Sequence, residues 1–308
     1  PRRPLARRVT AVKACVHELL AAVRRDDPDG VRRELDLGAS PDAEKGLGIF
    51  PETAVELAAG RDDVGLDVLA LLLERSGRWI DRSLAYAARK GRLDKVDMLL
   101  ASGRRADDVD ENGYTALTYA AGDVDLIDRL VEAGAPLRTP TKYGETLVGT
   151  LLWNGSREAV RRVVAIGGAP LSLGWTALHT AVVMDDADGI RRHAGDRLRE
   201  VPSCGTWTPG SVAVAMDHAH LLDLVDDPDE WMETALFADA RHSLAELLRR
   251  GASVSEAPIP SVRSVETFDL LVAAGADPAS RDEFESDGLV EDVSIEVLER
   301  FLAAGLDP

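Results

Sequence analysis

The chain has 308 residues, of which 45% are hydrophobic and only 5% aromatic, and a formal net charge of −18 at pH 7. No apolar run reaches the roughly 18 residues of a membrane span, and the first residues lack the apolar core of a signal peptide. We therefore expect a cytoplasmic protein with no membrane partner. The two cysteines, Cys15 and Cys204, show no CxxC spacing, which argues against a disulfide framework or a cysteine metal site.

Charge is distributed unevenly along the chain. Residues 1–35 hold nine basic and five acidic side chains, whereas residues 208–308 hold six basic and 22 acidic ones. An acidic end of this kind repels nucleic acid and attracts basic surfaces over long range. We expect no nucleic-acid partner, and a basic protein is among the partners that this charge favours.

A phrase of the form T-A-L-x-x-A-A recurs along the chain. Successive copies start 29 to 33 residues apart, at Thr53, Arg82 (a degenerate copy), Thr115, Thr146, Thr176 and Thr208. A leucine-rich phrase that ends in Gly-Ala, and often in Pro, runs in step with it. A fixed period of this length is typical of a repeat solenoid. We expect units at residues 10–46, 47–80, 81–113, 114–144, 145–174 and 175–206.

The unit from Thr115 shows the expected design. Thr115 caps a first short helix, which ends at Gly122. A second helix carries its apolar residues on one face, namely Leu126, Ile127, Leu130 and Val131. Gly134 and Pro136 end this helix, and the polar finger 137–145 leads to the next unit.

The array becomes irregular after about residue 193. A longer loop is expected at 193–211, a short helix pair at 212–231 and a recognisable unit at 232–253, whereas Pro258 and Pro260 interrupt the following first helix. Further helices are expected within 265–278 and 289–308. The sequence thus predicts one all-α solenoid over 1–308, with about 8–10 repeats: regular over 1–192, irregular with longer loops over 193–265, and C-terminal repeats with a cap over 266–308.

Three motifs resemble the ankyrin-repeat consensus, D-x-x-G-x-T-P-L-H-x-A-A followed by a helix that ends L-L-x-x-G-A-D-P. They are DENGYTALTYAA from Asp110, GWTALHTAV from Gly174 and LLVAAGADP from Leu270. The resemblance implies helix-turn-helix repeats with extended finger loops, and a surface that binds protein. It also implies that His179, the one histidine at the T-P-L-H position, hydrogen-bonds neighbouring finger backbone. Alanine replaces the proline of this phrase in most copies.

Aromatic residues at the finger tips are the candidate binding residues. Tyr114, Trp175 and Trp207 each precede the threonine of a repeat, at a place that lies near the finger tip in the ankyrin family. Exposed aromatics anchor binding hot spots, although packing of each ring on the adjacent finger is an equal alternative. The remaining tryptophans are expected in core or inter-repeat packing. The proposed binding set is Asp110, Glu111, Asn112, Tyr114, Lys142, Tyr143, Trp175 and Trp207.

Acidic residues gather in three turns: Asp107, Asp108, Asp110 and Glu111; Asp226, Asp227, Asp229 and Glu230; and Asp282, Glu283, Glu285 and Asp287. Each cluster alone is typical of capping and turn chemistry. Together they would form a negative strip that attracts a basic partner.

No catalytic residue, metal site or cofactor is predicted. Asp217, His218 and His220 form D-H-A-H, but the two imidazoles of an i, i+2 pair diverge on a helix. The sequence favours a non-enzymatic scaffold that binds another protein through its finger tips and concave face. Two alternatives stay open: an immunity-type or antitoxin-type inhibitor of a basic toxin or effector, and an enzyme or small-molecule binder with a pocket in 193–231 that uses Cys204 and the D-H-A-H residues. The oligomeric state stays open as well.

Overall fold

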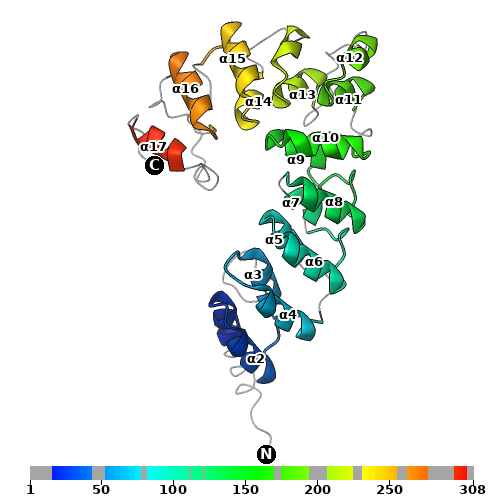
Figure 1. Cartoon of the computed structure of the whole chain (residues 1–308), viewed down its shortest axis with the longest axis vertical. Coiled ribbons are helices and arrows are strands. Elements are labelled where there is room, and N and C mark those ends of the chain that lie inside the picture. The colour runs from blue at the N-terminus through cyan, green and yellow to red at the C-terminus, as the bar shows by residue number, and fades with distance from the viewer. Residues whose placement is uncertain are drawn as a thin grey trace, which may run out of the picture. The chain divides into compact units, whose positions relative to one another are not determined.

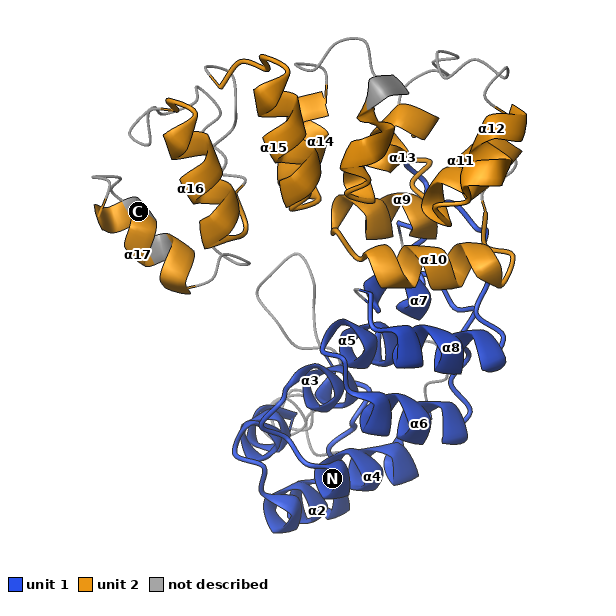
Figure 2. Ribbon diagram, turned by 45° about the horizontal axis from the view of Figure 1, so that its top comes forward, with its two compact units in different colours: residues 1–143 blue, residues 144–308 orange. Residues whose placement is uncertain are grey.

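A computed structural model describes residues 16–43, 53–77, 82–110, 112–120, 122–169, 175–193, 207–224, 231–254, 262–276 and 295–303. Every regular element in these ranges is a helix, and the one β-type contact is an isolated bridge between Val109 and Thr115. The chain divides into two compact units, residues 1–143 and 144–308 (Figure 2). No described helix is long and apolar enough to cross a membrane.

Unit 1 is built from pairs of short helices. After a helix that includes residues 16–24, its elements are α2 (Pro28–Asp36), α3 (Ala54–Gly60), α4 (Leu66–Arg75), α5 (Ser83–Arg89), α6 (Leu93–Ala101), α7 (Ala116–Tyr119) and α8 (Val124–Glu132). The first helices of successive pairs, α3, α5 and α7, pack side by side in one layer, and the second helices α2, α4 and α6 pack in another (Figure 1). Each repeat therefore buries its apolar face against its neighbours.

Unit 2 also contains pairs of short helices, and the second member of one pair is a 3₁₀ helix. Its elements are α9 (Leu147–Trp153), α10 (Arg157–Ala165), α11 (Ala177–Val183), α12 (Ala187–His193), α13 (Pro209–Ala215), the 3₁₀ helix η2 (Ala219–Leu224), α14 (Met232–Phe237), α15 (Arg241–Arg249), α16 (Val265–Ala273) and α17 (Ile295–Ala303). The predicted short pair thus begins three residues early, and its second member is 3₁₀ rather than α. Helices lie within 265–278 and 289–308, as the sequence predicts.

Threonines begin the first helices, as the recurring phrase predicts. Thr53, Thr115, Thr146, Thr176 and Thr208 are the N-cap residues of α3, α7, α9, α11 and α13. In α3, the Thr53 hydroxyl accepts from Glu56 N–H and the Glu56 carboxylate accepts from Thr53 N–H, which is a complete capping box. The degenerate start at Arg82 has no side-chain cap of its own. Its N–H donates instead to Glu56 of the preceding repeat, at 3.0 Å.

Aspartates with left-handed backbone link successive repeats. The residue in this conformation after the first helix is glycine in some repeats, and in four others it is an aspartate: Asp26, Asp185, Asp217 and Asp239. Asp26 Oδ1 accepts from Gly65 N–H at 2.8 Å, at the N-terminus of the next repeat's second helix. Asp217 Oδ1 accepts from Ser243 N–H at 2.8 Å in the same way. Aspartate tolerates this backbone, and its charge suits the positive end of a helix.

A charged side chain is buried inside unit 1. Lys95 is fully buried, and its ammonium donates hydrogen bonds to the carbonyl oxygens of Ala58, at 2.8 Å, and Arg61, at 2.5 Å. These carbonyls lie at the C-terminal end of α3, where no further helical turn would satisfy them. Burial lowers the pKa of Lys95. The residue therefore caps a helix of the preceding repeat from inside the core.

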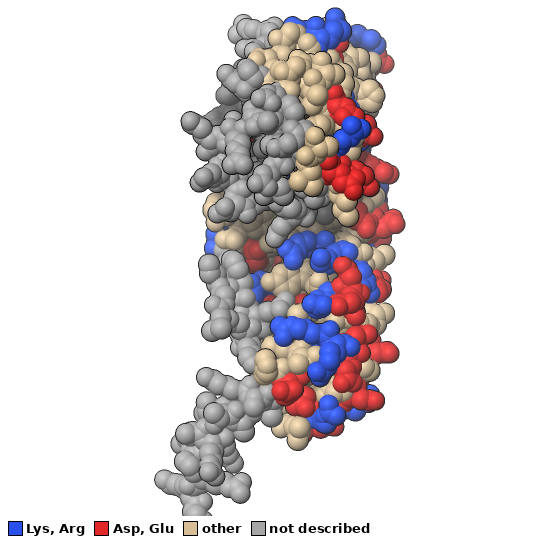
Figure 3. Space-filling model, turned by 90° about the vertical axis from the view of Figure 1, so that its left-hand side faces the viewer, with Lys and Arg blue, Asp and Glu red and all other residues tan. Residues whose placement is uncertain are grey.

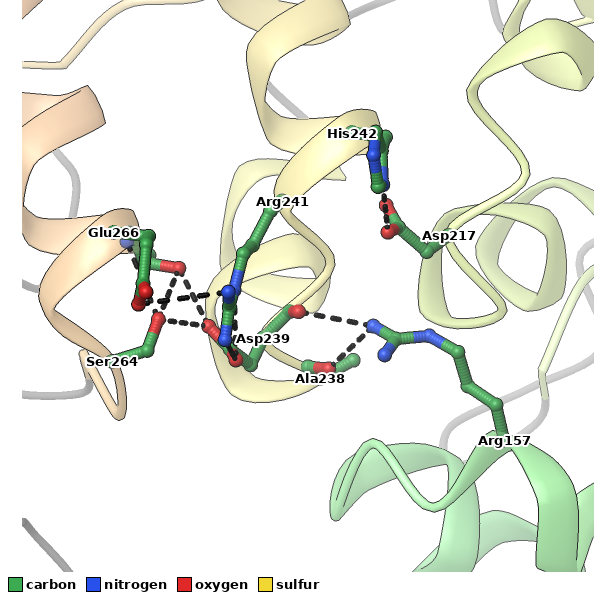
Figure 4. Close-up of polar contacts among 9 residues, drawn as sticks. Arg157, Asp217, Ala238, Asp239, Arg241, His242, Ser264 and Glu266 are labelled. Atoms are coloured by element: carbon green, nitrogen blue, oxygen red, sulfur yellow. Dashed lines mark hydrogen bonds and ion pairs between the residues drawn. The ribbon is translucent and has the colours of Figure 1, made fainter.

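In unit 2, the α9–α10 pair also touches repeats beyond its neighbour. Arg157 Nε–H donates to the Ala215 carbonyl at 3.1 Å. Its Nη2 donates to the carbonyls of Ala238, at 2.9 Å, and Asp239, at 3.0 Å (Figure 4). One guanidinium thus satisfies carbonyls at the ends of both α13 and α14. Gly155, in the turn before α10, lies so close to Ala238 that an added Cβ would come within 2.5 Å of the Ala238 carbonyl oxygen.

Candidate functional site

The finger of unit 1 that precedes Thr115 is organised by one carboxylate. Asp110 Oδ1 accepts from the N–H groups of Asn112, at 2.8 Å, and Tyr114, at 2.9 Å, and Oδ2 accepts from the Tyr119 hydroxyl at 3.0 Å. Burial and the hydrogen bond to Asp110 raise the pKa of Tyr119 to about 12. Both carboxylate oxygens of Asp110 therefore accept hydrogen bonds from its own repeat. Glu111 lies outside the described residues.

Two successive fingers of unit 1 meet beside this turn. Lys142 N–H donates to the Asn112 carbonyl at 2.9 Å, and the Tyr143 hydroxyl donates to Asn112 Oδ1 at 3.4 Å. Gly113, at φ 87°, allows this approach, because a Cβ there would lie 3.2 Å from Lys142 N. Tyr143 itself is 71% exposed. Asn112, Lys142 and Tyr143 are thus brought together, and the Tyr114 ring packs against Tyr119 at the end of α7, with the ring centroids 5.7 Å apart.

Trp175 does not have the exposure predicted for an anchor. It is only 6% exposed, its Nε1–H donates to Thr180 Oγ1 at 3.1 Å, and its ring stacks on His179 with centroids 4.9 Å apart. Both the apolar face and the single polar atom of the indole are satisfied within its own repeat. Trp175 is therefore not an exposed contact, and its ring packs on the helix of its own repeat rather than on the adjacent finger.

His179 has the structural role predicted for it. Its Nδ1 accepts from Thr176 N–H at 3.0 Å, so its other ring nitrogen carries the proton and donates to the Trp207 carbonyl at 2.8 Å. Burial lowers the pKa of His179, which keeps this neutral form. One imidazole thus closes the cap of α11 and also holds the start of the next repeat.

An aromatic cluster lies in unit 2, and the sequence did not single it out. The Trp153 ring contacts Trp207 at 5.1 Å and Phe237 at 5.2 Å between centroids, both edge to face. Trp207 is half-buried, and its Nε1 lies 3.1 Å from the place of a Cβ on Gly149, two repeats earlier. Trp153 is 42% exposed, and its contacts with Trp207 and Phe237 are packing between repeats, which the sequence favoured together with core packing. The spacing within α9 gives no sign of contacts that come from residues 207 and 237.

The D-H-A-H residues are engaged by different neighbours. Asp217 Oδ2 pairs with His242 at 2.6 Å (Figure 4), His218 Nε2 lies 3.3 Å from Arg161, and His220 Nε2 lies 2.9 Å from Asp185. The predicted divergence of the two rings is wrong. Their centroids are 5.7 Å apart, because α13 ends at Ala215 and this stretch is not a regular α-helix.

The described residues among these groups do not form a metal site. Within the described ranges, no cluster of three or more His, Cys, Asp or Glu residues is arranged to hold a metal ion. Cys204, which the enzyme alternative requires, lies outside the described residues.

Acidic residues of the unit 1 cluster pair with a neighbouring arginine. Asp107 forms an ion pair with Arg105 at 2.6 Å, and this hydrogen bond lowers the pKa of Asp107. Asp108 lies 3.9 Å from the same guanidinium. Side chains of both signs are interspersed on the described surface in Figure 3. The other two predicted clusters, at 226–230 and 282–287, lie outside the described residues.

The geometry defines an all-α array of helix-turn-helix units, with finger loops described between some of them. Residues 84–192 match a family model described as ankyrin repeats (3 copies). This part of the chain belongs to the ankyrin-repeat family, and the same helix pairs continue on both sides of it. No curated protein matches the chain. Arrays of this family generally mediate protein–protein interaction, through the extended surfaces that stacked repeats create.

Proposed function

We propose that the chain is a non-enzymatic scaffold that binds another protein through an aromatic surface on each unit. Tyr143 supports this proposal most directly, because a large aromatic side chain is held on Asn112 and still presented to solvent. A ring fixed in this way loses little conformational entropy on binding. Asn112 and Lys142 would supply polar contacts around it.

In unit 2, the corresponding surface would be the exposed edge of Trp153. The ring is braced by Trp207 and Phe237, and the Trp153 carbonyl accepts from Arg263 at 3.4 Å. Tryptophan is enriched among hot-spot residues because it buries much area from a rigid frame. Trp207 therefore keeps a place in the proposed site as a support, whereas Trp175 does not.

The test uses a photo-crosslinking residue at position 143 of the full chain to capture the partner in cells of the source organism. Affinity for the purified partner is then measured. Tyr143→Ala should weaken binding at least about 30-fold, the size of a hot-spot loss. Leu37→Ala is the matched control, because Leu37 is a similarly exposed apolar residue in unit 1. Equal affinities for the two variants, with unchanged helical content, would show that the finger surface is not the binding site.

The charge of residues 208–308 supports a basic partner, such as a basic toxin or effector that the chain neutralises. Acidic side chains outnumber basic ones there by 22 to six. Attraction of this kind raises the association rate more than the affinity. The association rate should fall steeply between about 0.05 M and 0.5 M salt. A rate that does not change with salt would exclude this proposal while leaving the aromatic surfaces in place.

A further inference from the structure

His218 lies where α10 meets the turn between α13 and η2. The side chain is only 7% exposed. Its Nε2 lies 3.3 Å from Arg161 Nη2 on α10, and the ring also takes part in a hydrogen bond with the Val182 backbone. A buried imidazole at a contact between non-adjacent repeats has no part in the binding surfaces proposed above.

The charged groups around this ring come from each element packed on it. Arg161 faces it from α10, Asp185 from the turn after α11, and His220 from η2 at 5.7 Å between ring centroids. The Asp185 carboxylate is already paired with His220, at 2.9 Å.

The remaining charges nearby have other partners. Asp217 is held by His242 and Ser243, and Arg157 is held by backbone carbonyls. Among the described residues, Asp185 is therefore the anion that acts on His218, and its carboxylate also pairs with His220.

The Arg161 contact fixes the protonation state of the ring. A guanidinium has donors and no acceptor, so Nε2 must accept, and the single proton of the neutral ring lies on Nδ1. Protonation would place an N–H group against the N–H groups of Arg161, with two positive charges side by side and one of them on a buried ring. We propose that His218 is an acid-sensitive latch, which holds α10 against the α13–η2 turn when neutral and releases it when protonated.

The electrostatics of the site agree with this geometry. Burial lowers the pKa of His218, Asp185 and a backbone hydrogen bond with Val182 raise it, and Arg161 and His220 lower it, so that the net shift is downward. A group whose pKa is lower in the folded state leaves more protons bound in the unfolded state. Stability is then full above the unfolded pKa of about 6.5 and is lost as the pH falls through the folded value.

The latch lies on the same helix pair as the unit 2 surface. Arg157 and Arg161 are one turn apart on α10, and Trp153 ends α9 directly before them. Release of α10 would therefore loosen the support of Trp153. A fall in partner binding at acid pH follows only if the proposed function is correct, whereas the effect on stability does not depend on a partner.

The experiment compares amide hydrogen exchange of the full chain at about pH 7.5 and about pH 5.5, corrected for intrinsic rates. Peptides from α10 and α13–η2 should lose protection in acid, while peptides from unit 1 should not. His218→Gln keeps an acceptor for Arg161 but cannot be protonated, and should abolish this loss. His242→Gln is the matched control, because His242 is exposed and pairs with an aspartate of the neighbouring repeat, and it should keep the wild-type response.

Equilibrium unfolding provides the second readout. Below about pH 6.5 the unfolding constant of the wild type should rise by up to about tenfold per pH unit relative to His218→Gln. Equal acid responses in these two proteins would overturn the proposal. If His218→Gln does not fold, Arg161→Gln decides, because an amide accepts from the protonated ring and should reduce the acid response. A full wild-type response in Arg161→Gln would equally overturn it.

Discussion

Replacement of Asp239 tests how the repeats are linked. This residue follows α14 with φ 44°, and its Oδ1 accepts hydrogen bonds from the hydroxyls of Ser264 and Thr267, both at 2.6 Å, at the start of α16. Its Oδ2 pairs with Arg241 at 3.2 Å (Figure 4). The residue thus combines a left-handed backbone with a carboxylate that serves the next repeat.

The two contributions can be separated by three substitutions. Hydrogen bonds to a charged group contribute about 1.5–3 kcal/mol, and a left-handed alanine costs about 1–2 kcal/mol. We take the lower end for each of the two hydroxyl hydrogen bonds because the carboxylate is half-buried, and expect Asp239→Ala to lower the free energy of unfolding by about 4 kcal/mol. Asp239→Gly relieves the backbone but loses the carboxylate, for a loss of about 3 kcal/mol. Asp239→Asn keeps an acceptor and tolerates the backbone, for a loss of about 1 kcal/mol.

Urea unfolding of the full chain, followed by circular dichroism, measures these differences. Hydrogen exchange of α16 peptides locates them. The test is the order of stability, in which the asparagine variant should be the most stable, the glycine variant intermediate and the alanine variant the least stable. If the asparagine variant is no more stable than the alanine variant, the hydrogen-bond reasoning is wrong. If glycine and alanine are equal, the backbone makes no contribution.

The acid response of the same residue gives an independent check. Burial raises the pKa of Asp239, but hydrogen bonds from Ser264, Thr267 and Arg241 outweigh burial, so its pKa lies below the usual value. The stabilisation is therefore complete above about pH 4 and is lost as the pH falls through the lowered pKa. Asp239→Asn should remove the loss of stability that comes from protonation of this carboxylate, and the acid unfolding due to other groups should stay unchanged.

Three further substitutions test other parts of the array. Gly155→Ala should lower the free energy of unfolding by about 3 kcal/mol, because its Cβ would meet the Ala238 carbonyl. Gly134→Ala has open space around it and should lower it by only about 1 kcal/mol. Urea unfolding measures both values. Lys95→Ala leaves a cavity and two unpaired carbonyls, and should lower the free energy of unfolding by about 3 kcal/mol. Amide hydrogens of α3 should exchange faster in this variant, and full protection of α3 would contradict the prediction. Tyr119→Phe should remove the tyrosine that ionises near pH 12 from a spectrophotometric titration, and any remaining tyrosine with that pKa would contradict the assignment.

The sequence predicted the helices well because their ends are determined locally. A threonine cap needs only the N–H groups two or three residues ahead, and all five predicted threonines begin a helix. The role of His179 was also predicted correctly, since it depends on one neighbouring finger. The structure differs from the prediction at η2, where the second helix of the expected short pair is a 3₁₀ helix.

The candidate site was less predictable, because exposure depends on residues far along the chain. Trp175 and Trp207 occupy the same position in their repeats, yet Trp175 stacks on its own helix while Trp207 reaches Trp153, 54 residues earlier in the sequence. The repeat period carries no information about such contacts. The two rings of D-H-A-H were misplaced for a related reason, since an i, i+2 argument holds only within a regular helix.

The contacts of Arg157 and Gly155 with Ala238 also determine how unit 2 can change in evolution. A solenoid held by nearest neighbours alone tolerates the gain or loss of a repeat, because the units on either side can restack. In unit 2, deleting the α11–α12 repeat would shift Ala215 and Ala238 away from the guanidinium that satisfies their carbonyls. We therefore expect the number of repeats between α10 and α14 to be constant among relatives of this chain, and length variation to occur in unit 1.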